Sequence, residues 1–139
     1  MSLSERIEAL ARDVVKREAP HADAVARARA TAERLHALVE SAIETFNGVV
    51  RDSVPYLEVG VTPLRTDDKH LHAVEFDLER GRHRAVITAK SKGEVTLVGP
   101  FRSGKSEGPC RSFPFEPHAE LEAALAEFVE RFLEEAAAP

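Results

Sequence analysis

The first residues of the chain carry the apolar spacing of an amphipathic helix. Ser2 and Glu5 stand at the separation of a capping box, in which a side chain at each end bonds a backbone N–H of the other. Apolar side chains then recur at helical intervals, which predicts a helix over residues 4–18. Pro20 has no backbone N–H to donate. We therefore expect this first helix to end, or to kink, at Pro20.

A longer helix is predicted over residues 21–46. Its apolar residues alternate steps of three and four, which is the a/d spacing of a coiled coil. Asn47-Gly48 then supplies a good helix C-cap. Such a seam packs either on the protein's own sheet or first helix, or on a second copy of the chain. The residues assigned to the candidate dimer seam are Val25, Ala32, Leu35, Val39 and Phe46.

From residue 55 onward the apolar pattern changes to a period of two, which is typical of β-strands. A first strand is predicted over 55–62, a loop over 63–70, and a second strand over 74–79 with one wet face. Gly81-Arg82 has the composition of a two-residue hairpin loop. A one-residue slip in this hairpin would set apolar residues opposite charged ones, so its register is well specified. The apolar pairs predicted for this and the following hairpin are Leu78–Ala85, Phe76–Ile87, Val74–Ala89, Ala89–Val95, Ile87–Leu97 and Ala85–Gly99.

The remaining segments complete an α+β fold. The third and fourth strands are predicted over 84–90 and 94–101, and a fifth extended segment over 110–115 contains Pro114, which suits a sheet edge. Strands grouped together between helices indicate a single two-layer α+β domain. Residues 1–139 are expected to form two N-terminal helices within 1–48, a four- to five-stranded antiparallel meander over 55–115, and one C-terminal helix over 117–136, with the helices on one sheet face.

Charge and cysteine content narrow the classes of partner. The net charge of -5 resides at the C-terminal end, because residues 112–139 hold one basic and seven acidic side chains. This sign argues against a nucleic-acid partner. The single cysteine, Cys110, fits a reducing compartment. We see no signal-peptide layout and no membrane-spanning stretch, so we expect a cytoplasmic protein, and the excess of Arg and Ala suggests a GC-rich bacterial genome.

Residues 99–106, Gly-Pro-Phe-Arg-Ser-Gly-Lys-Ser, fit the G-x-x-x-x-G-K-S pattern of a phosphate-binding P-loop. That site needs a helix starting at the Lys-Ser end, within a βαβ unit. Gly108-Pro109 disfavours such a helix, and the chain lacks βαβ alternation. We therefore interpret the match as a false positive and predict neither catalytic residues nor a cofactor. The side chains here that could still contact an anionic ligand are Arg102, Lys105 and Arg111.

Two further groups of residues are candidate sites. The small residues Ala85, Ala89 and Gly99 on the apolar sheet face allow either close approach of a helix or a ligand pocket between sheet and helices. His70 and His72 lie two apart, so in an extended segment both rings point to one side and could ligate zinc or iron. No third ligand can be assigned from the sequence.

The leading hypothesis is therefore a small interaction or adaptor protein that binds a protein partner or itself, with the helix over 21–46 as the dimer contact. The alternative is a small-ligand-binding protein or enzyme that uses a cleft between sheet and helices, with the Arg102–Arg111 loop as an anion contact. A nucleic-acid-associated regulator has the least support.

Overall fold

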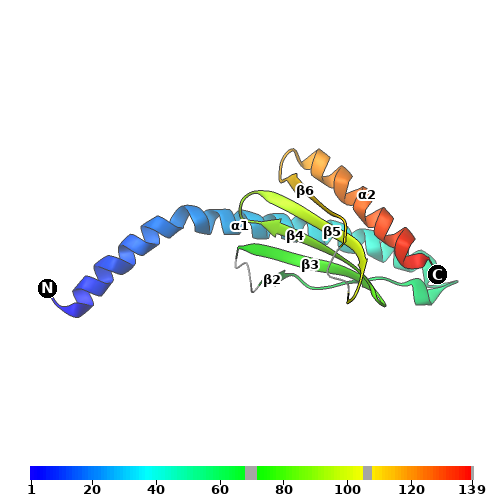
Figure 1. The fold of residues 1–139 in the computed structure, drawn as a ribbon, viewed down its shortest axis with the longest axis horizontal. Helices are drawn as coiled ribbons and strands as arrows, with labels where there is room; N and C mark the ends of the chain where they lie inside the picture. The colour runs from blue at the N-terminus through cyan, green and yellow to red at the C-terminus, as the bar shows by residue number, and fades with distance from the viewer. Residues whose placement is uncertain (68–71, 105–107, 139) are drawn as a thin grey trace.

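The computed structural model describes residues 1–67, 72–104 and 108–138, and it is an α+β fold with an antiparallel sheet of six strands and two helices (Figure 1). A short 3-10 helix follows the first helix. The elements in chain order are α1 (Leu3–Val50), η1 (Pro55–Leu57), β1 (Gly60–Val61), β2 (Arg65–Thr66), β3 (Ala73–Arg80), β4 (His83–Lys90), β5 (Glu94–Arg102), β6 (Cys110–Pro114) and α2 (His118–Ala137).

The prediction of two N-terminal helices is wrong, because α1 is one helix of 48 residues with Pro20 inside it. Proline removes one helical hydrogen bond and costs about 3 kcal/mol in a helix interior. That cost does not end the helix here, since alanines and long straight side chains with high helix propensity surround the proline. The predicted cap is confirmed, because the Ser2 hydroxyl accepts a 3.1 Å hydrogen bond from the Glu5 backbone N–H. The helix curves in its N-terminal half (Figure 1).

The sheet is a meander in the order β1-β3-β4-β5-β6, with β2 also paired to β3. The predicted register of β3 against β4 is confirmed for every pair, including Phe76 with Ile87. Between β4 and β5 the register shifts at Arg84/Val86, so the regular ladder stops one residue short of the predicted Ala85–Gly99 pair. The predicted first strand over 55–62 is mostly absent, because Pro55–Leu57 forms the 3-10 turn and only Gly60–Val61 pairs with β3.

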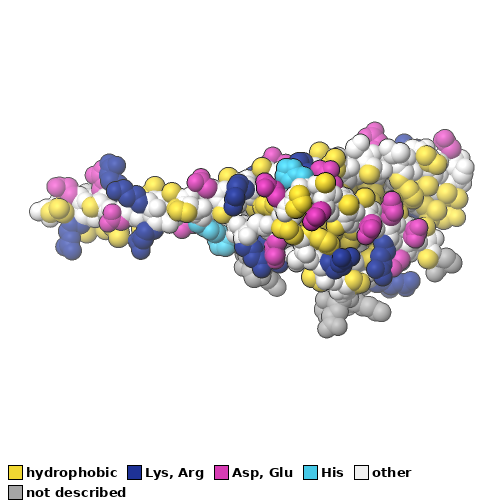
Figure 2. Space-filling view, turned by 90° about the horizontal axis from the view of Figure 1, so that it is seen from above, with side chains coloured by type: hydrophobic (Ala, Val, Ile, Leu, Met, Phe, Trp, Pro, Cys, Tyr) yellow, Lys and Arg dark blue, Asp and Glu magenta, His cyan; other side chains and the backbone are white. Residues whose placement is uncertain are grey.

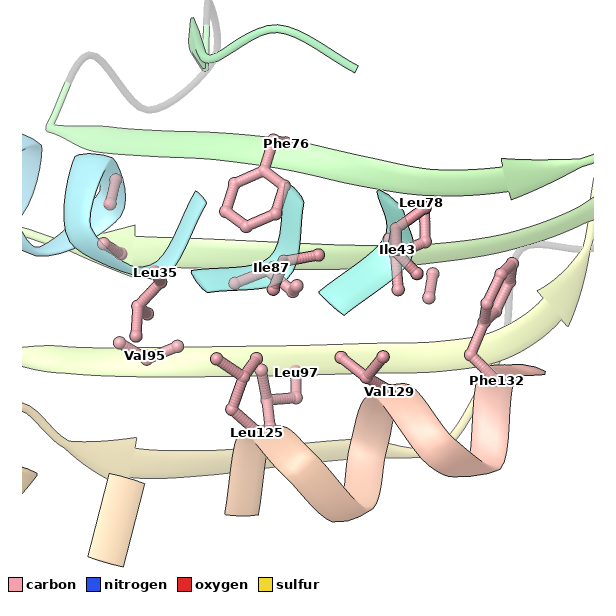
Figure 3. Close-up of a cluster of buried hydrophobic side chains, with 14 of the residues drawn as sticks. Leu35, Ile43, Phe76, Leu78, Ile87, Val95, Leu97, Leu125, Val129 and Phe132 are labelled. Atoms are coloured by element: carbon pink, nitrogen blue, oxygen red, sulfur yellow. The ribbon is translucent and has the colours of Figure 1, made fainter. Parts of the chain in front are cut away.

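Both helices cover the same face of the sheet, where a single apolar core lies between the layers (Figure 3). Leu35 and Ile43 reach it from α1, and Leu125 and Phe132 reach it from α2. Ala85 is fully buried within this core, so the small residue serves close packing of a helix on the sheet. The other sheet residues of this core are Val74, Phe76, Leu78, Ile87, Ala89, Val95 and Leu97.

Asn47 ties the end of α1 to the segment that enters the sheet. Its side-chain amide donates to the Val59 carbonyl at 2.9 Å, and its side-chain oxygen accepts from the Val59 backbone N–H at 2.8 Å. Val59 is buried, so both of its backbone groups would lose their partner if this side chain were removed. The role of Asn47 is therefore to make a tertiary contact with the Val59 backbone, and not to cap the helix.

Asn47→Ala is expected to lower the free energy of unfolding by about 1–3 kcal/mol, because it leaves a buried donor and a buried acceptor unpaired. Urea titration followed by circular dichroism measures the change. Thr45→Ala is the matched control, since the Thr45 hydroxyl only bonds the Ser41 carbonyl on an exposed part of the same helix. Equal stability of the two variants would contradict the role assigned to Asn47.

Candidate functional site

The N-terminal part of α1 projects beyond the sheet. Residues 1–20 are all exposed, and the first fully buried residue of the helix is Ala28. We call residues 3–20 of α1 the overhang. In the space-filling view it forms a rod that leaves the body of the protein and carries apolar and charged side chains along its length (Figure 2).

The overhang carries an exposed apolar stripe. Its members, Leu3, Ile7, Leu10 and Val14, follow one another at steps of four, three and four, which places them on one side of a helix. Their exposed fractions are 75, 53, 53 and 46% in that order. At 1.5 Å per residue the stripe is about 17 Å long. A continuous apolar stripe of this kind in water is typical of a surface that contacts another polypeptide.

The stripe lies on the same side of α1 that packs on the sheet further along. A spacing of 18 residues is about five helical turns. Ile7, Leu10 and Val14 therefore lie in line with Val25, Ala28 and Ala32. Ala28 and Ala32 are buried against the sheet, whereas their counterparts in the overhang have no described element beneath them. The overhang thus presents a core-type helix face at a place where the protein's own sheet has ended.

Different residues flank the two sides of the stripe. Arg6 and Asp13 lie along one side, and the small residues Ser4 and Ala11 lie along the other. Arg12 lies on the opposite face of the helix, where it pairs with Glu8 at 2.7 Å. Over residues 3–14 the helix is therefore apolar on one side only, with Arg6 and Asp13 bordering that side, whereas Arg17 and Glu18 follow beyond the end of the stripe.

The predicted dimer seam lies in the protein's own core. Ala32, Leu35 and Val39 are buried between α1 and the sheet, Phe46 is partly buried against the same core, and Val25 is half-buried. The seam packs on the sheet because the a/d spacing of its apolar residues fits the surface of a sheet as well as it fits a second helix. The sequence predicted the helix over 4–18 but could not show that its apolar face lies beyond the sheet, since spacing alone does not tell what covers a face.

The candidate ligand residues are not brought together in one cleft. Ala85 and Ala89 are packed inside the core. Gly99 and Arg111 line a cavity of about 120 Å³ between α2 and the strands β5 and β6. Arg102 instead lines an open depression of about 430 Å³ beside His83, and Lys105 lies outside the described residues.

The stretch that matches a P-loop forms the end of β5 and the turn that follows it. Gly99 is in β5, Ser103 and Gly104 are in a turn, and Gly108 precedes β6 without helical structure. The match at Ser106 lies outside the described residues. No helix begins in the described part of this stretch, which lacks the helix N-terminus that a P-loop uses to hold phosphate.

The structure brings His72 next to a residue that the sequence did not suggest. A ring nitrogen of His72 lies 2.7 Å from one of His21 in α1, and the two rings meet edge to face. The Glu18 carboxylate is 3.8 Å from His21. No group of three or more metal-ligating side chains occurs among the residues that the structure describes, and His70 lies outside them. Since 51 residues separate the two histidines, no local pattern could have predicted their contact.

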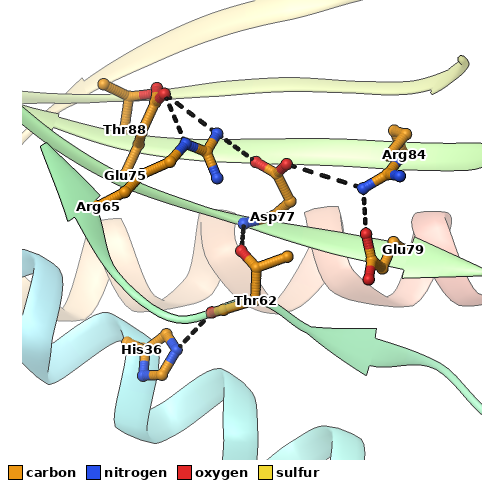
Figure 4. Close-up of polar contacts among 8 residues, drawn as sticks. All are labelled: His36, Thr62, Arg65, Glu75, Asp77, Glu79, Arg84 and Thr88. Carbon is orange, nitrogen blue, oxygen red and sulfur yellow. Dashed lines mark hydrogen bonds and ion pairs between the residues drawn. The ribbon is translucent and has the colours of Figure 1, made fainter. Parts of the chain in front are cut away.

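The sheet face away from the helices carries a network of ion pairs (Figure 4). Arg65 contacts Glu75 at 3.0 Å and Asp77 at 2.7 Å, and Arg84 reaches both Asp77 and Glu79. Burial lowers the pKa of Arg65, but its hydrogen bonds and proximity to the two carboxylates outweigh burial and raise that pKa above its usual value. Three carboxylates share two guanidinium groups, so each charged side chain of this network has a partner of opposite charge.

A groove with an apolar floor lies between α1 and α2, with a volume of about 330 Å³. Leu38 and Ala42 line it from α1, and Ala126 and Leu133 line it from α2. An ion pair of 2.6 Å between Arg34 and Glu122 joins the two helices beside it. The groove is open and sits on the body of the protein, apart from the overhang.

Neither helix in the described ranges contains a segment long and apolar enough to cross a membrane. Compared with known protein families, with curated proteins and with solved structures, the chain has no match. Any proposal about function therefore rests on how the residues of this chain are arranged.

Proposed function

We propose that the protein is an interaction protein of the adaptor type, and that it associates with itself through the overhang. The observation that carries this proposal is the exposed stripe of Leu3, Ile7, Leu10 and Val14 on a helix that continues unbroken into the core. The dimer contact is thereby moved from the predicted seam over 21–46, which packs on the sheet, to residues 3–14, which the sequence analysis assigned to a separate first helix.

Physical chemistry supports a weak and reversible contact. Moving apolar side chains out of water lowers the free energy of the system. A helix that is already folded also loses little further backbone freedom on binding. The stripe is short, so the buried area falls in the range of small interfaces, for which we expect a dissociation constant on the order of tens of micromolar. An equilibrium of this kind depends on protein concentration and suits an adaptor that assembles and disassembles.

The sequence-based alternative, a small-ligand site, has less support. The cavity beside Gly99 and Arg111 has a volume of about 120 Å³, below the range of about 300–1,000 Å³ for small-molecule pockets, and the depression at Arg102, of about 430 Å³, is open to solvent. Arg102 and Arg111 line separate depressions, so they do not converge on one anion. An adaptor function in the cytoplasm with a protein as partner therefore remains our proposal.

Ile7→Gln and Leu10→Gln are each expected to weaken self-association by roughly tenfold or more, because each removes one apolar contact from both halves of the pair. Glutamine has nearly the helix propensity of leucine, so the overhang should remain helical. Sedimentation equilibrium over a range of concentrations measures the dissociation constant, and circular dichroism monitors the helix.

Val15→Gln is the matched control for these substitutions. Val15 is 68% exposed but lies off the stripe, so the dissociation constant should not change. A wild-type chain that stays monomeric at every concentration, or a Leu10→Gln variant that associates like wild type, would contradict the proposed function.

A further inference from the structure

We propose that two overhangs pair side by side in antiparallel orientation, so that the two folded bodies lie at opposite ends of the pair. This inference rests on the proposed function and names both the partner, a second copy of the chain, and its direction. In the pairing, Leu3 of one copy lies opposite Val14 of the other, and Ile7 lies opposite Leu10. All four stripe residues of each copy, which are exposed in the single chain, then contact the other stripe.

The position of the sheet favours this direction. The stripe faces the side of α1 on which the sheet lies, and the sheet begins to cover that side near His21, which contacts His72. In a parallel pair in register, each helix would continue along the side that the other copy's sheet already occupies, so the helices would have to separate before His21. In an antiparallel pair, the second helix reaches its own body in the opposite direction. The second helix begins at its Leu3, which lies opposite Val14 of the first copy and does not reach the sheet of that copy.

The charges beside the stripe also favour the antiparallel direction. Arg6 and Asp13 occupy the same side of the stripe, and in antiparallel helices equivalent flanks face each other. Arg6 of each copy then faces Asp13 of the other, which gives two symmetric pairs of opposite charge. On the second flank, Ser4 faces Ala11, and these small side chains allow close approach of the helices.

A parallel pair would place like charges together. Asp13 would face Glu18 of the second copy, and Arg6 would face Ala11 without a partner. The core residues alone, β-branched at Ile7 and Val14 and leucine at the other two positions, are those that favour parallel dimers in long coiled coils. Over a stripe of two heptads, the flanking charges and the sheet outweigh this preference.

The antiparallel pair has a consequence for an adaptor. The groove between α1 and α2 and the polar sheet face belong to the body, so both remain uncovered in each copy. The dimer then carries two identical bodies that face away from each other along one rod. A partner that has two sites for the body would then be held by both bodies at once, and this bivalent binding would increase the effective affinity of the partner for the dimer.

Two charge-reversal variants and their mixture test the direction. In the antiparallel dimer, Arg6→Asp sets two carboxylates against each other at both flanking contacts, and Asp13→Arg sets two guanidinium groups against each other. Each variant alone should therefore associate roughly tenfold more weakly than wild type. An equimolar mixture of the two should regain wild-type association. In the mixed pair, one flanking contact joins the two substituted side chains, which carry opposite charges, and the other flanking contact joins the unchanged Arg6 and Asp13. Sedimentation equilibrium of the full chain, with circular dichroism to confirm equal helix content, gives the dissociation constants.

Arg12→Asp is the matched control, since it makes the same charge change on the opposite face of the helix and should leave the dissociation constant unchanged. If Asp13→Arg instead strengthens the dimer, the pair is parallel, because the new arginine would then face Glu18. That result, or a mixture no tighter than its components, overturns the inference while leaving self-association through the overhang intact. A monomeric wild-type chain would refute the proposed function itself.

Discussion

Phe132→Ala is expected to lower the free energy of unfolding by about 3–5 kcal/mol, the range for removing a buried phenylalanine ring. Phe132 is 0% exposed and points from α2 into the core that both helices share with the sheet (Figure 3). The loss combines the apolar area returned to water with the cavity left behind. Thermal unfolding followed by circular dichroism should show a midpoint lower by roughly 10–20 °C.

Two further variants of α2 test whether the burial and the volume of the ring determine the loss of stability. Phe128→Ala makes the same chemical change on the same helix, but Phe128 is only partly buried, so we expect a clearly smaller loss. Phe132→Leu keeps most of the volume and should cost less than about 1.5 kcal/mol. Equal losses for Phe132→Ala and Phe128→Ala would show that α2 does not anchor the core through Phe132.

The strands that could be predicted are those in which local and tertiary preferences agree. In β3 and β4 the buried apolar residues alternate with mostly polar ones, and only one register places Phe76 beside Ile87 while keeping Glu79 beside Arg84. The first predicted strand had the same alternation over 55–62, but two tertiary facts override it. Pro55 starts a 3-10 turn, and the Asn47 side chain takes both backbone groups of Val59.

The helices show where sequence patterns stop being informative. The heptad spacing over 21–46 correctly predicts a helix, yet the same spacing fits a sheet and a second chain, because both offer an apolar surface to one side of a helix. Proline was expected to end or kink the helix, but it does not end it, because one missing hydrogen bond is a local cost and the residues around it have high helix propensity. The exposed stripe at Leu10 could be recognised only once the end of the sheet was known.

The candidate site residues illustrate the same limit. Gly99 and Arg111 line one cavity, whereas Ala85 and Ala89 are buried in the core beneath the helices. Small side chains on a sheet face leave room, and whether a helix or a ligand takes that room depends on helices distant in the sequence. The pairing of His72 with His21 likewise depends on the path of α1 past the sheet.

Gly99→Ala is expected to destabilise the fold by about 3 kcal/mol or more, because two separate costs combine at this position. The backbone of Gly99 has a φ of +118°, which residues with a Cβ rarely adopt. A Cβ there would also stand 3.0 Å from the Arg84 carbonyl oxygen and 3.1 Å from the Ala85 Cα, which are backbone atoms of the neighbouring strand. These atoms cannot move aside as the end of a flexible side chain could.

Gly93→Ala separates the two costs. Gly93 also has a positive φ, +96°, in the turn between β4 and β5, but no atom lies within 4 Å of the place of its Cβ. Its loss should therefore reflect the backbone conformation alone, about 1–2 kcal/mol. The excess for Gly99→Ala in urea unfolding then measures the close approach of β5 to β4 where their register shifts. Such an excess would explain the first glycine of the P-loop-like stretch by strand packing, whereas equal losses would leave that glycine without a packing role.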